Sequence, residues 1–122
     1  MPRALFATAV GAAAILTLLT GCGRVQAVGP NRTLSVAVTE YRINPQSVTA
    51  SQGQLTIVVH NYGRLSHNLA VLSGSVEMAT TSAIAPGQSA AITVTLTPGK
   101  YALASTVMSD QALGTYGTLT VR

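Results

Sequence analysis

Few side chains of this 122-residue chain can take part in chemistry, because it holds one cysteine, two histidines and three acidic residues. Two of these, His67 and Asp110, would supply an imidazole nitrogen and a carboxylate oxygen, a donor pair that can hold Cu(II) weakly. The thioether of Met108 would favour Cu(I). His60 precedes His67 by seven residues, so the two imidazoles either face each other or lie on opposite faces. These residues are the candidate metal ligands of the chain.

The single cysteine lies at the end of an N-terminal targeting segment. A positive start, Met1-Pro2-Arg3, precedes the uncharged run Ala4–Leu19, which is shorter than the roughly twenty residues of a membrane-spanning helix. The run leads into Leu19-Thr20-Gly21-Cys22, which resembles the lipobox of bacterial lipoproteins. The resemblance implies that residues 1–21 are a signal peptide and that Cys22 receives acyl chains such as palmitate. We therefore expect an exported protein, anchored through Cys22 to membrane lipid and facing the periplasm or the cell exterior.

The rest of the chain divides into a tether and one domain. Residues 22–32 contain Gly, Pro and Asn without a helical or strand period, which is typical of a flexible tether. Residues 33–122 are then the folded domain. Basic residues outnumber acidic ones by seven to three, but they are scattered singly along the chain. Nucleic-acid binding requires a clustered basic face, so we exclude that class of partner.

Alternating apolar residues predict β-structure throughout the domain. Such alternation runs along residues 34–38, 55–59 and 92–96. Turn signals such as Asn44-Pro45 and Ala85-Pro86-Gly87 separate these runs. Short strands without a long helical period indicate an all-β, antiparallel Greek-key sandwich of about seven strands.

A catalytic role finds no support in the pattern. With Cys22 acylated, a nucleophile would have to be a hydroxyl, such as Ser105 beside His67. That pair would still need an orienting carboxylate and an oxyanion hole, and no nucleophile-elbow motif is present. Paired-carboxylate hydrolysis would require Glu40 and Glu77 to converge, which nothing in the sequence indicates. We therefore predict that the protein is not an enzyme.

Two segments of the domain resemble the cupredoxin family. The first, Thr56–Val71, contains a strand that runs into Asn61-Tyr62-Gly63, followed by a short loop and the pair His67-Asn68. The second runs from Pro98-Gly99-Lys100-Tyr101 to the final segment Gly114–Val121. It is similar to the closing strand, ligand loop and last strand of the family. The resemblance covers about residues 33–122 and implies a cupredoxin-like fold.

The family also implies a ligand set. Its members hold copper with two histidines, a cysteine thiolate and a weak axial methionine. The resemblance places the first histidine at His67, the cysteine at Ser105, the second histidine near Asp110 and the methionine near Thr115. Three of these four ligands are therefore replaced. Because a serine hydroxyl stays protonated, it cannot stand in for the thiolate, and we do not expect blue-copper electron transfer.

Two hypotheses of function remain. The first is a domain without a cofactor that acts as a binding or interaction module. Its protein partner would meet the end of the sandwich around Tyr62, Leu65, His67, Leu113 and Tyr116. The resemblance further implies that Asn61 and Gly63 are structural, with the Asn61 amide tying the loops of this end together. The alternative is a copper-handling protein that uses His67 with Asp110, Met108 or His60.

Overall fold

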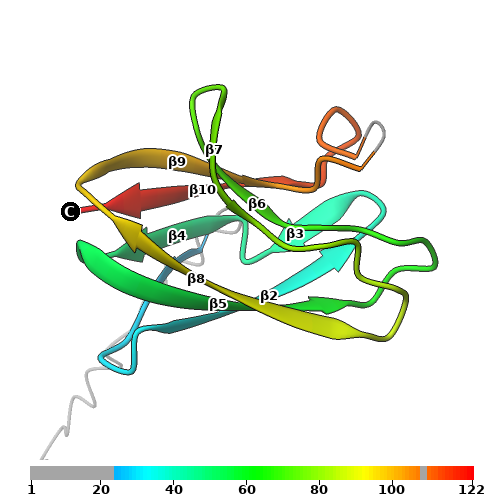
Figure 1. Cartoon of the computed structure of the whole chain (residues 1–122), viewed down its shortest axis with the longest axis horizontal. Coiled ribbons are helices and arrows are strands. Elements are labelled where there is room, and N and C mark those ends of the chain that lie inside the picture. The colour runs from blue at the N-terminus through cyan, green and yellow to red at the C-terminus, as the bar shows by residue number, and fades with distance from the viewer. Residues whose placement is uncertain (1–23, 108–109) are drawn as a thin grey trace, which may run out of the picture.

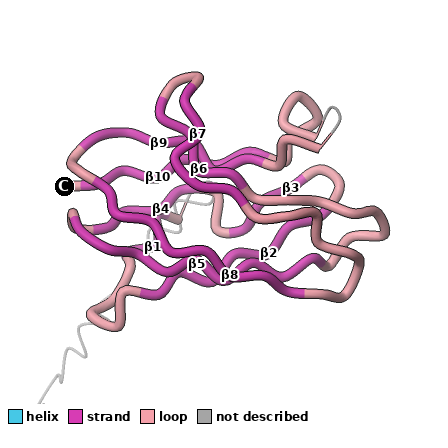
Figure 2. Tube along the Cα trace, viewed as in Figure 1, coloured by secondary structure: helices cyan, strands magenta, loops and turns pink. Residues whose placement is uncertain are grey.

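The computed structural model describes residues 24–107 and 110–122, which form ten strands and no helix (Figure 2). The strands are β1 (Val25–Ala27), β2 (Thr33–Thr39), β3 (Arg42–Asn44), β4 (Ser47–Ala50), β5 (Gly53–Asn61), β6 (Ala70–Ser73), β7 (Val76–Thr80), β8 (Ser89–Leu96), β9 (Gly99–Ala104) and β10 (Tyr116–Val121). The expected signal peptide, Cys22 and Met108 lie outside the described residues. Within the described part, no helix is long and apolar enough to cross a membrane.

The strands form two sheets that pack face to face as a β-sandwich (Figure 1). One sheet has six strands in the order β1-β4-β10-β9-β6-β7, and the other has four in the order β3-β2-β5-β8. The prediction of an all-β sandwich is therefore confirmed. The loops that follow β2, β5, β7 and β9 gather at one end of the sandwich, away from the C-terminus (Figure 1).

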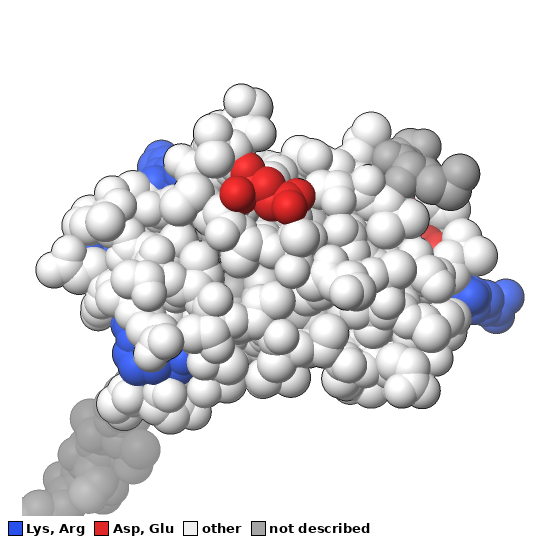
Figure 3. Space-filling view, in the orientation of Figure 1, with Lys and Arg blue, Asp and Glu red and all other residues white. Residues whose placement is uncertain are grey.

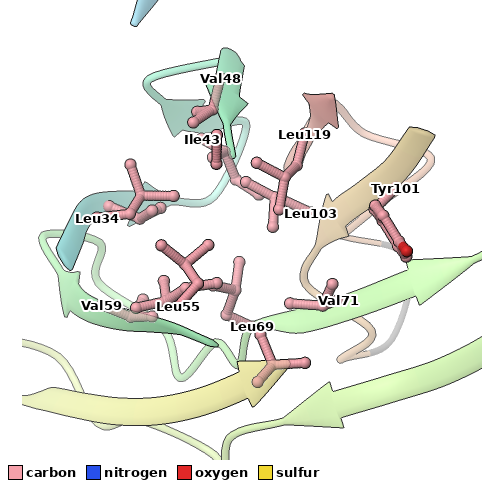
Figure 4. Close-up of a cluster of buried hydrophobic side chains, with 14 of the residues drawn as sticks. Leu34, Ile43, Val48, Leu55, Val59, Leu69, Val71, Tyr101, Leu103 and Leu119 are labelled. Carbon is pink, nitrogen blue, oxygen red and sulfur yellow. The ribbon is translucent and has the colours of Figure 1, made fainter. Parts of the chain in front are cut away.

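The alternation in the sequence decides which side chains fill the core. Along β5, Leu55, Ile57 and Val59 are buried, whereas the residues between them are half-buried on the outer face. Figure 4 shows how Leu34 and Leu55 of the four-stranded sheet approach Leu103 and Leu119 of the other sheet. Full burial of one such aliphatic side chain contributes roughly 1.5–3 kcal/mol. The core is thus built from Val, Leu and Ile, with Tyr101 at its margin.

Strand number and direction differ from the expected antiparallel arrangement of about seven strands. Three pairs run parallel, namely β1 with β4, β4 with β10, and β2 with β5. The cause is a change of sheet at Asn44-Pro45, where the chain leaves β3 and enters the six-stranded sheet as β4. When β5 returns to the first sheet, it therefore runs in the same direction as β2. The additional strands are short pieces such as β1 and β3, which the alternation does not reveal.

The segment expected to be a flexible tether also differs from the prediction where it is described. Val25–Ala27 pairs with Ser47–Thr49 in parallel register. The guanidinium of Arg32 donates to the carbonyl oxygens of Ser51 at 2.7 Å and Gln54 at 3.1 Å. These contacts hold residues 25–32 against the sandwich.

Candidate functional site

His67 lies at the centre of the loop-bearing end of the sandwich and is fully buried. Its peptide group pairs with Ile84 in an isolated bridge, which fixes the backbone between β5 and β6. Its ring lies between two carboxylates, with Nδ1 2.5 Å from Asp110 Oδ2 and Nε2 3.4 Å from Glu40 Oε1. A neutral imidazole carries one N–H, whereas the doubly protonated ring can donate to both carboxylates. The ring therefore links the loop after β9 to the turn after β2.

Asp110 is held from two sides. Its Oδ2 accepts hydrogen bonds from His67 Nδ1 and from Ser105 Oγ, each at 2.5 Å. The Ser105 hydroxyl in turn accepts the backbone N–H of Asn68 at 3.3 Å. Backbone bonds close the loop, since Ser105 N donates to Thr115 O at 3.1 Å and Thr115 N donates to Asp110 O at 2.9 Å. The structure thus brings together His67, Ser105 and Asp110, which are 43 residues apart at most.

Thr115 is buried beside this network, but its hydroxyl does not face His67. It lies 2.9 Å from the carbonyl oxygen of Glu40 and 3.2 Å from that of Thr39. The fourth ligand position of the family is therefore occupied by a side chain that binds the backbone at the end of β2.

Glu40 is a member of the site that the sequence analysis considered only as a partner of Glu77. Its Oε1 accepts the N–H groups of Arg64 and of Leu65, the latter at 2.8 Å. The Leu65 N–H is the largest cause that lowers the pKa of Glu40 to about 2 from its ordinary 4.5, followed by the Glu40 backbone, the Arg64 N–H and the His67 side chain. Because β2 and β5 pair in parallel, both strands end on the same side of the sheet. Glu40, directly after β2, therefore lies next to the loop that follows β5.

Asn61 and Gly63 shape the loop that carries these N–H groups. The Asn61 amide donates to the carbonyl oxygens of Leu65 and Ile84, both at 2.8 Å, and its Oδ1 accepts Gly63 N–H at 2.8 Å. A Cβ at residue 63 would lie 2.5 Å from Glu40 Oε1 and 3.0 Å from His67 Nε2. Only glycine leaves room here for both partners.

The Glu40 carboxylate gives the domain a pH-dependent stability that can be measured. Because its pKa is lower in the folded than in the unfolded chain, its charge stabilises the fold above about pH 4.5, and this contribution is lost as the pH falls toward 2. We expect the difference in free energy of unfolding between wild type and Glu40→Gln, from urea denaturation, to be constant above about pH 5 and to shrink below it. The control is Glu77→Gln, an exposed position on β7. A wild-type advantage that persists unchanged to about pH 3 would contradict the assignment.

The other expected ligands do not join His67. His60 lies on the outer face of β5, where its Nδ1 is 2.5 Å from Ser89 Oγ and its ring packs on Tyr62 with a centroid distance of 4.2 Å. The alternation along β5 already assigns it to the face opposite Asn61, which is buried. Met108 lies outside the described residues. The two imidazoles are therefore on opposite faces.

The donor set does not fit a type 1 copper centre. Such a centre requires a thiolate and two imidazoles around one point, whereas positions 105 and 110 carry a hydroxyl and a carboxylate that bond to each other. Glu40 and Asp110 face opposite sides of the His67 ring, so they cannot meet at one ion bound to it. Among residues 24–107 and 110–122, no cluster of three or more His, Cys, Asp or Glu side chains could hold a metal. A hydrolytic triad is equally absent there, because Ser105 bonds to Asp110 rather than to His67.

Exposed apolar side chains surround this buried network. Tyr41, Leu65 and Leu113 are each more than half exposed, and we call these three the end surface. Tyr41 follows Glu40 directly, Leu113 lies three residues after Asp110, and the Leu65 N–H donates to Glu40. His67 is buried beneath it and does not contribute to the surface. Tyr62 packs on His60, and Tyr116 lies beside Thr118 on the outside of the six-stranded sheet. Charged side chains cover only small, separate areas of the face in Figure 3.

Comparison with known proteins places this geometry in a family. The family model described as a cupredoxin-like domain matches residues 11–121. The chain belongs to the cupredoxin-like family. No curated protein matches it.

Solved structures share the fold of this cupredoxin-like chain. Reduced auracyanin from Roseiflexus castenholzii superposes with a TM-score of 0.71 at 22% identity, covering 77% of this chain and 99% of that one. Auracyanin A from Chloroflexus aurantiacus, a "blue" copper protein, gives 0.67 at 19% identity, covering 79% and 99%. A multicopper oxidase gives 0.61 at 20% identity, covering 82% of this chain and 46% of its own. The fold thus occurs both in a small "blue" copper protein and within a larger multicopper oxidase.

Proposed function

We propose that this protein is a lipid-anchored module of the cell envelope, whose cupredoxin-like domain binds a protein partner without using copper. The observation that best supports this proposal is the hydrogen bonding of Asp110. Its Oδ2 accepts hydrogen bonds from His67 and Ser105 at 2.5 Å each. In this family the residues at these three positions would converge on copper, and here they converge on a carboxylate oxygen instead. The lipobox-like residues ending at Cys22 support the anchor.

A buried polar network of this kind holds loops in place. The carboxylates of Glu40 and Asp110 connect the turn after β2, the loop after β5 and the loop after β9 through His67. Side chains from the same three loops form the end surface. Fixed loops lower the conformational cost of binding, because fewer side chains and backbone angles become ordered on association. The network therefore connects these three loops through side chains alone.

Copper titration tests this proposal against the copper-handling alternative. We expect the mature chain with Cys22→Ser to bind neither Cu(II) nor, under reducing conditions, Cu(I) with a Kd below about 1 µM, as measured by calorimetry and by competition with a chelator. His67→Ala is the control variant. Stoichiometric binding that is tighter than this and is lost in His67→Ala would overturn the copper-free proposal and favour copper handling.

The interaction role has its own test. A photo-crosslinking amino acid at Leu65 or Leu113 of the membrane-anchored protein is expected to give a discrete adduct with one partner in cells. The matched control is the same amino acid at Thr95. This exposed residue lies near the C-terminal end of β8, opposite the start of β5 and therefore away from the loop after β5. No adduct from the end surface, or the same adducts from Thr95, would contradict a partner at this end.

A further inference from the structure

A groove lies at the edge of the sandwich where β1 meets β3. Its volume is about 510 Å³, and it is lined by two arginines, Arg24 and Arg42, by the amide-bearing residues Gln26, Asn44 and Gln46, and by the apolar residues Val25, Ile43 and Pro45. Both arginines are exposed. Guanidinium and amide N–H groups are donors that match the oxygen atoms of phosphate.

No carboxylate of the described residues lines this groove. Glu40 is close to Arg42 in sequence, but its carboxylate accepts N–H groups of the loop after β5. Asp110 is bonded to His67, and Glu77 lies on β7, at the opposite edge of the sheet from β1. The positive charge of the groove is therefore not compensated within residues 24–107 and 110–122. Arg32 differs, because its guanidinium is occupied by backbone carbonyl oxygens.

The groove lies close to the expected anchor. Arg24 follows Cys22 by two residues, and two extended residues span at most about 7 Å. That distance is shorter than the Debye length of about 8 Å at physiological ionic strength, so Arg24 of an anchored chain remains within the field of anionic headgroups. Beside it, the side chain of Val25 is 60% exposed and offers an apolar contact to the interface.

We infer that this groove binds the phosphate groups of anionic phospholipids and thereby sets how the anchored domain stands on the membrane. The inference rests on the proposed anchoring through Cys22. Because β1 and β3 are edge strands of the two sheets, this contact turns that edge toward the lipid. The opposite edges, β7 and β8, then face away from the membrane.

Paramagnetic NMR on nanodiscs tests the orientation. The single thiol of the mature chain, Cys22, is coupled to a maleimide lipid, and gadolinium-labelled headgroups broaden amide signals near the surface. With phosphatidylglycerol present, we expect broadening to concentrate on Val25–Ala27 and Arg42–Asn44 and to spare Thr93–Thr95 of β8. In pure phosphatidylcholine, the difference in broadening between these strands and β8 should become smaller. Equal broadening of β3 and β8 in both lipids would overturn the inference.

Matched variants separate the groove from overall charge. The variant Arg24→Gln with Arg42→Gln is expected to lower the preference for this orientation about 30-fold, or roughly fivefold for each arginine near an anionic surface. Arg64→Gln with Lys100→Gln removes the same charge elsewhere and should leave the orientation unchanged. If both double variants lose it equally, net charge and not the groove is responsible, and the inference fails.

Two further experiments test whether the bound phosphate belongs to lipid or to a soluble ion, and whether Cys22 is acylated. Saturable shifts of the Arg42–Gln46 signals with inorganic phosphate, at concentrations that abolish the preferred orientation, would instead assign the groove to a soluble oxyanion. Because the tether here is chemical, the orientation does not depend on acylation in the cell. Absence of radiolabelled palmitate on Cys22 would therefore refute the anchor, whereas loss of orientation on the nanodisc would refute the groove.

Discussion

The variant Ser105→Cys, Asp110→His and Thr115→Met is expected to bind one Cu(II) ion with a Kd below about 1 µM and to acquire an intense visible absorption from thiolate-to-copper charge transfer. His67 Nδ1 and Ser105 Oγ both lie 2.5 Å from one atom, Asp110 Oδ2. A metal ion near that point would be within reach of the thiolate and both imidazoles. Backbone hydrogen bonds already hold residues 105, 110 and 115 in place. The loop backbone therefore does not have to rearrange for the new side chains to reach the metal. Optical titration with Cu(II) measures the outcome, with Cys22→Ser throughout.

The matched control keeps Asp110→His and Thr115→Met but carries Ser105→Ala. It retains both imidazoles and lacks the thiolate, so it should bind copper weakly and without the charge-transfer band. If the three-residue variant folds with a wild-type far-UV circular dichroism spectrum and remains colourless with copper, positions 67, 105 and 110 do not share a ligand point. That result would remove the main support for the proposed function.

The buried core is the part of this domain that local sequence patterns predict well. A period of two along β5 predicts which side chains point inward, and Leu55, Ile57 and Val59 are all buried. The family resemblance assigned Ser105, Asp110 and Thr115 to one loop; Ser105 and Asp110 are hydrogen-bonded to each other, whereas the Thr115 hydroxyl faces the backbone at the end of β2. Short-range constraints leave few alternatives for such residues.

Glu40 could not be assigned in that way, because its role depends on pairing between distant strands. It precedes His67 by 27 residues, and the two meet because β2 lies parallel to β5 and the chain changes sheets between them. The direction of a strand and its neighbours are decided by the whole sheet. The local alternation of apolar residues does not reveal either of them. Two features of the sequence could have pointed to Glu40. It is one of only three acidic residues, and it follows directly after the alternating run that forms β2. His60 is the opposite case, because the alternation alone assigned it to the outer face.

Loss of the His67 ring should destabilise the domain more than loss of any other polar side chain in the site. His67→Ala removes a fully buried ring and leaves the carboxylates of Asp110 and Glu40 facing a cavity without a donor between them. Each buried polar group left without its hydrogen-bond partner costs about 1–3 kcal/mol, and truncation of a large buried side chain adds about 2–5 kcal/mol. Total stabilities of about 5–15 kcal/mol are usual for domains, so this is a large fraction. Urea denaturation at neutral pH, followed by circular dichroism, measures the change.

The second histidine supplies the control for this prediction. His60→Ala removes the same side chain from an outer face, where it has an exposed hydrogen bond to Ser89 and packs on Tyr62, and should cost less than about 1.5 kcal/mol. The variant His67→Gln separates packing from hydrogen bonding, because its single amide nitrogen can lie beside only one of two carboxylates that face opposite sides of the ring. We therefore expect its stability to lie between those of wild type and His67→Ala. If His67→Ala is no less stable than His60→Ala, the two carboxylates are not held by the ring, and the loops at this end are ordered by the backbone alone.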